Sequence, residues 1–499
     1  MLKYVKETFK NSFIYGIGNI SVKLVGFVLL PFLTNPKYLS IEDYGALGVF
    51  EAVSQILVLL VGLGLYNSLF RWYYEQSENE NKSTFFTASA LVTVLVLAVV
   101  FISLLYREKL SLLLFNNSNY QDVLLLVIIS TGLQAIGNLP ATLMRLQDRA
   151  AFFTSSNLLK LFVTLIATLY YLLVLEEGLK AIYVGQIAGF TSYIIFLIPY
   201  VFKNTIARIH IPVFKEMLGY GISMMIAGAV AASINVLDRF VLNSRSGLVE
   251  VGLYSLGYKI SSLLKVFVIG SVSMAITPII FRKINDEDNR RFYTKSMTYY
   301  GFVMMICIMV VSLFSKEFLK IFTGSTTYWA SFAVIPVLAF SMYFVALKEI
   351  VVTGLHITKK TSRISLTTAI ISSLNLALNF ALIPYFGAIG AAIASLLSQA
   401  CYFGGLFYFS NKVYPIQFEW RKITLMFILG ALLVYVALLT NDWELIPRLI
   451  IKVIAILLFP ILLYTLNFFE EIELLQIKKI WQDWKNPKNW SQNIKRLFT

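Results

Sequence analysis

The sequence predicts an all-α polytopic membrane protein, and three observations carry this prediction. Hydrophobic residues make up 58% of the 499-residue chain and charged residues only 14%, a balance foreign to soluble enzymes. The mean hydropathy is +0.74. Apolar blocks long enough to cross about 30 Å of hydrocarbon recur along the whole chain, with short polar breaks between them.

These blocks predict about fourteen transmembrane helices by the length rule. The predicted spans are 11–34, 43–70, 84–106, 121–144, 151–175, 179–202, 214–243, 249–281, 292–314, 328–350, 363–384, 387–410, 421–440 and 446–468. The first block is too long for a signal peptide and lacks a small-residue cleavage site, so we expect it to remain as a span. Cys307 and Cys401 fall inside predicted helices, so we expect neither a disulfide framework nor a metal site.

Lysine and arginine gather in alternate loops, which sets the expected orientation. The segments 203–215, 282–295 and 359–363 are basic, and so are the two ends of the chain. Because cytoplasmic loops are enriched in these residues, we expect both termini to be cytoplasmic. The net charge of +15 then requires no nucleic acid partner, since a one-sided basic surface beside anionic lipids accounts for it.

Three pairs of short segments match in the same order along the chain, which predicts an internal repeat. The pairs are Tyr15-Gly16-Ile17 with Tyr220-Gly221-Ile222, Asp43-Tyr44-Gly45 with Glu250-Val251-Gly252, and Gly178-Leu179-Lys180 with Gly387-Ala388-Ile389. Each copy holds six spans, an even number, so both copies keep one orientation. We therefore expect two six-helix lobes, related by a pseudo-two-fold axis along the membrane normal, with a cavity between them.

The repeat divides the chain into four expected parts. These are an N-terminal six-helix lobe (1–205), a C-terminal six-helix lobe (206–412), two additional transmembrane helices (413–469) and a tail (470–499). The tail mixes tryptophan and leucine with lysine and is too charged to span a bilayer. We expect it to form an amphipathic helix in the cytoplasmic interface.

Four lysines lie deep inside predicted spans: Lys23, Lys160, Lys259 and Lys265. A cation at bilayer depth is costly, so such a residue marks a functional site by default. The lysines therefore predict an anionic cargo.

In the first span Tyr15, Asn19 and Lys23 recur at helical spacing and share one face. We expect this face to line a wet cavity. The alternative is that Asn19 and Lys23 only hold a neighbouring helix, since polar side chains also serve as packing contacts in membranes.

The eighth span carries Tyr258, Lys259, Ser262 and Lys265 on one broad polar face. Two lysines on such a face can hold a diphosphate, because each ammonium is a mobile point charge with three donors. The alternative is that Lys259 pairs with Glu51, which the repeat places at a nearby position of the second span.

Other charged residues inside spans have less defined roles. Asp238 and Arg239 end the seventh span, where they form a gate or an interfacial pair. Lys160 either supports its neighbours or contacts cargo directly. We assign no cargo role to Lys348 or Lys452, which can pair locally or extend toward the interface.

Residues 8–75 resemble a known family. The run Lys10-Asn11-Ser12 through Tyr15-Gly16-Ile17-Gly18-Asn19, then Pro31, Tyr38-Leu39-Ser40-Ile41-Glu42-Asp43-Tyr44-Gly45, Gly62-Leu63-Gly64 and Arg71, is similar to the opening of Wzx-type bacterial polysaccharide flippases. These flippases belong to the multidrug/oligosaccharidyl-lipid/polysaccharide flippase superfamily. The span count and the repeat extend the resemblance over the whole chain.

The resemblance implies a function and a location. Wzx-type proteins move undecaprenyl-diphosphate-linked oligosaccharide from the cytoplasmic to the periplasmic leaflet of the bacterial inner membrane, by alternating access through a cationic cavity. Their cargo serves the synthesis of lipopolysaccharide O-antigen, capsule, exopolysaccharide or teichoic acid. We therefore expect a monomeric transporter without catalytic residues or cofactor, working alongside a polysaccharide polymerase and glycosyltransferases. Coupling to Na⁺ or H⁺ is left open.

Two other function classes compete with this expectation. A cation-coupled drug antiporter on the same fold would need a buried carboxylate, for which Glu51 and Asp238 are the candidates. A membrane glycosyltransferase or polymerase would be expected to carry a large loop with clustered acids or a catalytic histidine. The two histidines, His210 and His356, fall in predicted cytoplasmic loops instead.

Overall fold

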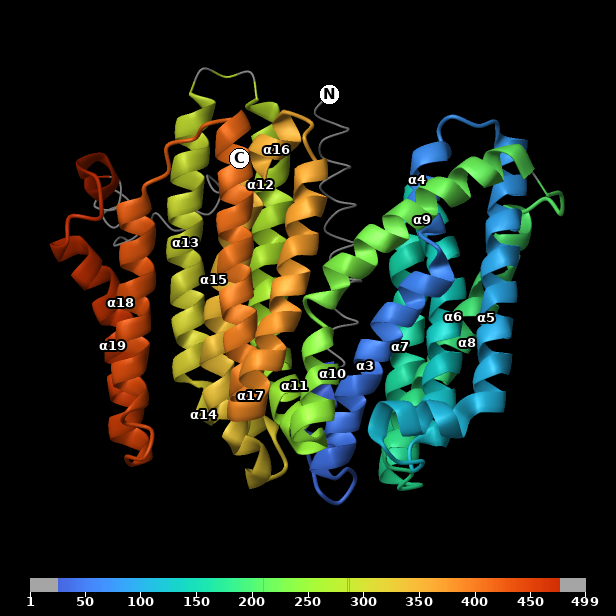
Figure 1. The fold of residues 1–499 in the computed structure, drawn as a ribbon, viewed down its shortest axis with the longest axis horizontal. Helices are drawn as coiled ribbons and strands as arrows, with labels where there is room; N and C mark the ends of the chain where they lie inside the picture. Colours follow the sequence, from blue (N-terminus) through green and yellow to red (C-terminus); the bar gives the residue numbers. More distant parts are fainter. Residues whose placement is uncertain (1–25, 210, 285, 287, 476–499) are drawn as a thin grey trace, which may run out of the picture. The chain divides into compact units, whose positions relative to one another are not determined.

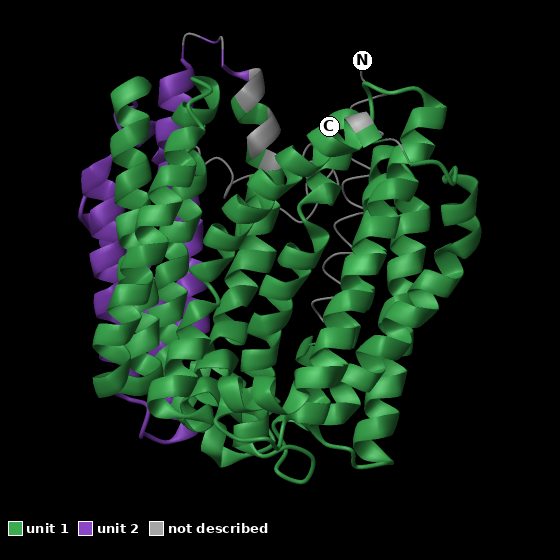
Figure 2. Cartoon of the chain, turned by 45° about the vertical axis from the view of Figure 1, so that its right-hand side comes forward, with its two compact units in different colours: residues 1–281, 315–415 green, residues 282–314, 416–499 purple. Residues whose placement is uncertain are grey.

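The computed structural model describes residues 26–209, 211–284, 286 and 288–475. Tyr15, Asn19 and Lys23 lie outside these ranges, as does the tail beyond residue 475. The described parts of residues 1–281 and 315–415 form one compact unit, unit 1, and those of residues 282–314 and 416–499 form another, unit 2 (Figure 2). The predicted lobe boundaries at residues 205 and 412 stay predictions.

All regular elements in the described ranges are helical, as the sequence predicts (Figure 1). The first part of unit 1 contains α2 (Leu30–Leu33), α3 (Ile41–Gly62), α4 (Leu65–Trp72), α5 (Glu78–Phe115), α6 (Gln121–Leu146), α7 (Ala150–Leu173) and α8 (Leu179–Lys203). It continues with α9 (Ile211–Ser233), α10 (Leu237–Ser246), α11 (Leu248–Leu263), the π-helical turn η1 (Leu264–Ile269) and α12 (Gly270–Arg282). The second part contains α14 (Ser315–Phe322), the 3₁₀ turn η2 (Thr326–Ala333), α15 (Val334–Val351), α16 (Thr353–Ile357) and α17 (Ser362–Val413).

Twelve stretches of these helices and those of unit 2 are long and apolar enough to cross a membrane, counted over the described residues. The chain is thus a multi-pass membrane protein. The predicted first span begins outside the described ranges, and two predicted spans fall in the single 52-residue helix α17. The number fourteen therefore stays a prediction.

Helix α17 folds back on itself at Gly387. The backbone there has φ 52° and ψ −131°, a conformation that side chains with a β-carbon rarely adopt. Asn375 donates a hydrogen bond to Ser398 at 3.1 Å, and Thr368 lies 2.7 Å from the Tyr402 hydroxyl. These contacts pair the two halves of α17 antiparallel, in agreement with the predicted spans 363–384 and 387–410.

Gly178 has nearly the same backbone conformation as Gly387, with φ 54° and ψ −130°. The sequence repeat aligns these two glycines, and each precedes a long helix. On the other side of the second glycine, Glu250 accepts a hydrogen bond from the Ala388 backbone N–H at 2.7 Å. The two copies of the sequence repeat therefore share the same backbone conformation at Gly178 and Gly387.

Helices α3 and α11 cross at two glycines that the repeat also aligns. A β-carbon on Gly45 would overlap the carbonyl oxygen of Leu248, and one on Gly252 would lie 3.0 Å from the carbonyl oxygen of Ile41. Ile41 and Leu248 each precede the glycine of their own helix by four residues. Such reciprocal contacts are those of a local two-fold relation between the helices.

The predicted seventh and eighth spans are less regular than expected. The seventh is divided by a turn at 234–236 into α9 and α10. Helix α9, green in Figure 1, contacts α3, α4, α5 and also α17, so it links the N-terminal helices to the C-terminal ones of unit 1. The eighth span is α11 and α12 with the turn η1 between them.

Unit 2 contains the remaining helices: α13 (Asn289–Leu313), α18 (Trp420–Leu438) and α19 (Leu445–Thr465). Helix α13 packs on both α18 and α19. Gly430 permits the close approach of α18, since a β-carbon there would meet the Met305 side chain. Lys452 of α19 is fully buried and lies 6.0 Å from the centre of the Phe314 ring, so it does not extend to the interface.

Candidate functional site

A polar pocket lies in unit 1 between α9, η1, α15 and α17. Its volume is about 210 Å³. The lining residues are Ala231, Ile234, Asn235, Lys265, Met342, Val345, Lys348, Thr368, Gln399 and Tyr402. Two of them are lysines and none is acidic.

Lys265 and Lys348 reach this pocket from different elements. Lys265 belongs to the turn η1, and Lys348 lies near the end of α15, with its ammonium 4.6 Å from the centre of the Tyr402 ring. Lys348 interacts electrostatically with Glu349, which attracts its ammonium, and with Lys265, which repels it. π-Helical turns inside α-helices occur frequently at functional sites, and this one places Lys265.

The sequence interpretation missed Lys348, because its position near a span end is typical of a lysine that extends to the interface. It also missed Gln399, whose amide lies among small and apolar residues of the predicted twelfth span. A polar side chain in the middle of such a span is a signal that could have found Gln399. No comparable signal exists for Lys348.

Lys259 has surroundings different from those of Lys265. Its ammonium lies 4.0 Å from the Glu51 carboxylate of α3 and 5.9 Å from the centre of the Tyr44 ring. The pairing that the sequence left open as an alternative is therefore present. A β-carbon on Gly26 would lie 3.4 Å from Cε of Lys259, so the chain just after the predicted position of Lys23 passes this lysine.

Two other predicted site residues lie beside Lys259. The Tyr258 ring is covered by the Arg239 guanidinium, whose centre lies 5.1 Å from the ring centre. The Ser262 hydroxyl donates to the Lys259 backbone carbonyl at 2.7 Å. Ser262 is thus engaged within its own helix, whereas Tyr258 joins the charged cluster at α10.

Asp238 and Arg239 are buried at the start of α10, with 0% and 2% of their surfaces exposed. Asp238 accepts hydrogen bonds from the Tyr254 hydroxyl and, at 2.8 Å, from the Arg239 backbone N–H. Tyr254 also lies 3.3 Å from the Ser395 hydroxyl. Among the residues that the structure describes, Nε and Nη1 of Arg239 have no hydrogen-bond partner. The Arg239 guanidinium therefore has two N–H donor atoms that are not used in hydrogen bonds within the described structure.

Lys160 lies away from both clusters, between α7 and α8. Its ammonium donates to Oδ1 of Asn157 at 2.8 Å and lies 5.2 Å and 4.9 Å from the ring centres of Phe190 and Tyr193. These contacts favour the supporting role over direct contact with cargo, the two roles that the sequence left open.

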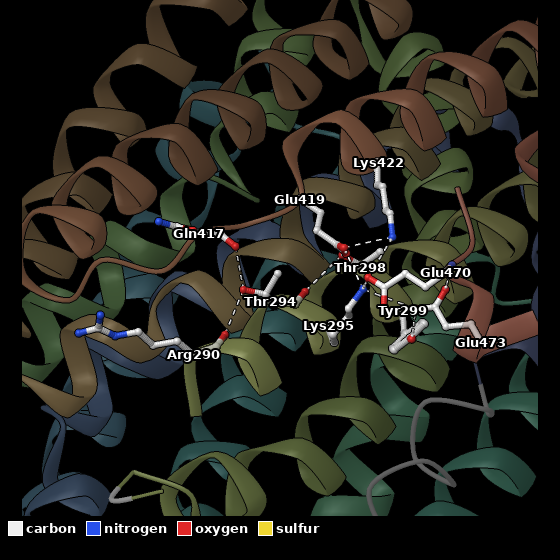
Figure 3. Close-up of polar contacts among 10 residues, drawn as sticks. All are labelled: Arg290, Thr294, Lys295, Thr298, Tyr299, Gln417, Glu419, Lys422, Glu470 and Glu473. Atoms are coloured by element: carbon white, nitrogen blue, oxygen red, sulfur yellow. Dashed lines mark hydrogen bonds and ion pairs between the residues drawn. The ribbon is translucent and has the colours of Figure 1, made fainter. Parts of the chain in front are cut away.

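A third charged cluster lies in unit 2, where α13 meets the start of α18 and the segment after α19 (Figure 3). The Lys295 ammonium contacts three carboxylates: Glu419 at 2.9 Å, Glu473 at 3.5 Å and Glu470. Lys422 also lies 3.1 Å from Glu419. The cluster ties the segment after α19 to α13 and α18.

Hydroxyl groups complete this cluster and affect its acids. Thr298 donates to Glu419 at 2.6 Å, and Tyr299 donates to Glu473. Burial raises the pKa of the Glu419 carboxyl, but the bonds from Thr298, Lys295 and Lys422 outweigh burial and hold this pKa below its ordinary value. The pKa of Glu473 is lowered in the same way, mainly by Tyr299 against the effect of burial.

No group of His, Cys, Asp and Glu side chains in the described ranges is arranged to hold a metal ion. The clusters above consist of cations and their counter-charges.

Comparisons with known proteins agree with this architecture. Residues 8–284 match the family model described as polysaccharide biosynthesis protein. The capsular polysaccharide biosynthesis protein CapF of Staphylococcus aureus is 25% identical over 226 residues, which cover 43% of this chain and 53% of CapF.

Two solved structures share the fold. Lipid II flippase MurJ in an inward closed conformation aligns with a TM-score of 0.71 at 16% identity, over 92% of this chain and 100% of MurJ. A multidrug resistance MATE family transporter of the MOP superfamily, in an inward-facing conformation, aligns with a TM-score of 0.67 at 12% identity, over 82% and 98% of the two chains.

Proposed function

Because this chain belongs to the polysaccharide biosynthesis protein family, we propose that it is a flippase that moves a lipid-linked oligosaccharide across a membrane. The cargo is an oligosaccharide on undecaprenyl diphosphate, carried from the cytoplasmic to the outer leaflet of the bacterial inner membrane. It serves the synthesis of a surface polysaccharide such as capsule or O-antigen. The protein carries out transport and no covalent chemistry.

The observation that supports this proposal is the pocket with Lys265 and Lys348. Two ammonium groups, the amides of Asn235 and Gln399 and the Tyr402 hydroxyl line one space of about 210 Å³. A diphosphate offers several anionic oxygens to such donors, and charge-assisted hydrogen bonds to it are strong. A neutral sugar would gain little from paired lysines, whereas an anionic head group offsets the repulsion between them.

Lys259 and Lys23 extend the proposed path of the head group. Lys259 lies on α11, six residues before Lys265. We also expect Lys23 to contact the head group, together with Tyr15 and Asn19 on the same predicted helix face. The head group enters from the inner leaflet, is held by these cations, and leaves when the helices of unit 1 open to the other side.

The competing function is a cation-coupled drug antiporter. We consider it because the fold is shared with a MATE family transporter. Such a protein needs a carboxylate that is available to a cation. In this structure Glu51 faces Lys259, and Asp238 accepts from Tyr254 beside Arg239. Both acids already have donors or cations next to them, which favours an anionic cargo.

The test uses purified protein in liposomes that carry a fluorescent disaccharide on undecaprenyl diphosphate, with quenching from outside to follow transport. We expect the variant Lys265→Gln/Lys348→Gln to transport the probe at least about tenfold more slowly, because two charge-assisted contacts are lost. Lys320→Gln removes one charge outside the pocket and serves as the control. Wild-type transport rates in the double variant, at equal protein content, would contradict the proposal.

A further inference from the structure

Glu51 and Lys259 join two helices that the repeat makes equivalent. Glu51 lies on α3 and Lys259 on α11, close to where these helices cross at Gly45 and Gly252. Their charged atoms are 4.0 Å apart, and the side chains are 43% and 21% exposed. The pair is thus longer than the contacts of Lys295 with Glu419 and Glu473, at 2.9 Å and 3.5 Å.

The pair belongs to a larger charged cluster, in which the cations Lys259 and Arg239 face the acids Glu51 and Asp238. Besides Lys259, Glu51 interacts electrostatically with Arg239, whose own neighbour Asp238 is already bonded to Tyr254. Only 2% of the Arg239 surface is exposed, yet two of its guanidinium nitrogens lack a hydrogen-bond partner in the described structure. Buried donors without an acceptor are unfavourable, so these two nitrogens favour a hydrogen-bond acceptor beside them.

We propose that Glu51 is an internal competitor for the anionic head group of the cargo, occupying Lys259 until that head group displaces it. This inference rests on the proposed function, since it requires an anionic cargo. A diphosphate brings more negative charge than one carboxylate, so it competes with Glu51 for Lys259. Its arrival frees Glu51 and breaks the ion pair between α3 and α11.

The exchange couples binding to the loss of one contact between α3 and α11, whose crossing at Gly45 and Gly252 remains. At 4.0 Å the attraction between Glu51 and Lys259 is weaker than in a close ion pair, so a doubly charged group displaces Glu51 and a neutral one does not. Glu51 therefore acts as a positioning and selectivity residue. Lipids without a charged phosphate group leave the ion pair between Glu51 and Lys259 closed.

The test measures the affinity of full-length protein in detergent for inorganic pyrophosphate by calorimetry. We expect Glu51→Gln to bind pyrophosphate about fivefold more tightly than wild type, because the competing carboxylate is gone. Lys259→Gln should bind more weakly. In the double variant Glu51→Gln/Lys259→Gln, the gain should vanish, since Glu51 acts through Lys259.

Two further variants separate exchange from general effects of charge and folding. Glu176→Gln removes an equal charge from an exposed ion pair with Lys37 and should leave the affinity unchanged. Glu51→Asp keeps the charge but shortens the side chain, and should bind with an affinity between wild type and Glu51→Gln.

The outcomes distinguish this inference from the proposed function. Equal pyrophosphate affinity in wild type and Glu51→Gln overturns the proposed exchange. It does not contradict the proposed transport of an anionic cargo. A higher pyrophosphate affinity that persists in the double variant also overturns the exchange, because the effect of Glu51 then does not depend on Lys259. If none of the proteins binds pyrophosphate, the proposed function fails together with the exchange.

Discussion

Single carboxylates in this protein face more than one cation, and their surroundings decide how they behave. Glu51 is half-exposed and loosely paired, so a competing anion can replace it. Glu419 is held by Lys295, Lys422 and the Thr298 hydroxyl, with only 21% of its side chain exposed. The first arrangement suits exchange and the second suits a permanent tie.

The cluster around Glu419 should make stability depend on pH. Because the folded pKa of Glu419 lies below its ordinary value of 4.5, the stabilisation is full above that value and is lost as pH falls toward the folded pKa. The wild-type melting temperature should therefore drop as the pH falls below about 4.5. Glu419→Gln should cost about 1–3 kcal/mol at pH 7 and flatten this dependence.

Thermal melts of the protein in detergent at pH 7 and at acidic pH measure both effects. Glu471→Gln is the matched control, since it removes the same charge from an exposed neighbour of the cluster. An unchanged melting curve of Glu419→Gln at pH 7 would show that the cluster contributes nothing to stability.

At the scale of elements, glycines set how closely helices approach and where they turn. Helices α3 and α11 touch through their backbones at Gly45 and Gly252, and α17 reverses at Gly387. The sequence repeat contains all three glycines, so the crossing and the reversal fall at positions that the repeat had already marked.

Gly45→Ala should separate α3 from α11, because its β-carbon would overlap the Leu248 carbonyl oxygen. Overpacking of this kind costs about 1–3 kcal/mol, so the melting temperature should fall. The control is Gly404→Ala in α17, where a β-carbon meets no atom within 4 Å. That variant should be neutral or more stable by up to about 1 kcal/mol, since alanine favours helix. Equal melting temperatures for the two variants would show that the crossing is not tight.

Some elements were beyond prediction from hydropathy. The turn η1 changes the hydrogen-bond spacing over Leu264–Ile269 without any change in composition, so the apolar pattern of the eighth span gave no sign of it. The apolar pattern of the seventh span likewise gave no sign of the turn at 234–236 that divides it. By contrast, the repeat did indicate that Glu51 lies close to Lys259. Contacts between repeated positions were thus predictable, whereas contacts such as that of Lys348 with Lys265 depend on the packing of unrelated helices.

At the scale of the molecule, loops that alternate in the sequence gather at two opposite ends of unit 1. Lys37 pairs with Glu176 at 3.0 Å, and both residues lie in predicted outer loops. Gln147 donates to Asn204 at 2.8 Å, and both lie in predicted inner loops. Each of these contacts thus joins two loops that the sequence predicts on the same side of the membrane. The basic loops predict which of the two sides is cytoplasmic.

Cysteine labelling checks this orientation. In a background with Cys307→Ala and Cys401→Ala, we expect Glu176→Cys to react in intact cells with a maleimide that cannot cross the membrane. Lys203→Cys should react only after the cells are opened, because its exposed position belongs to a basic loop expected on the cytoplasmic side. Both sites are exposed, so access to the reagent and not burial decides the result. The reverse pattern would invert the topology, and the path of the cargo with it.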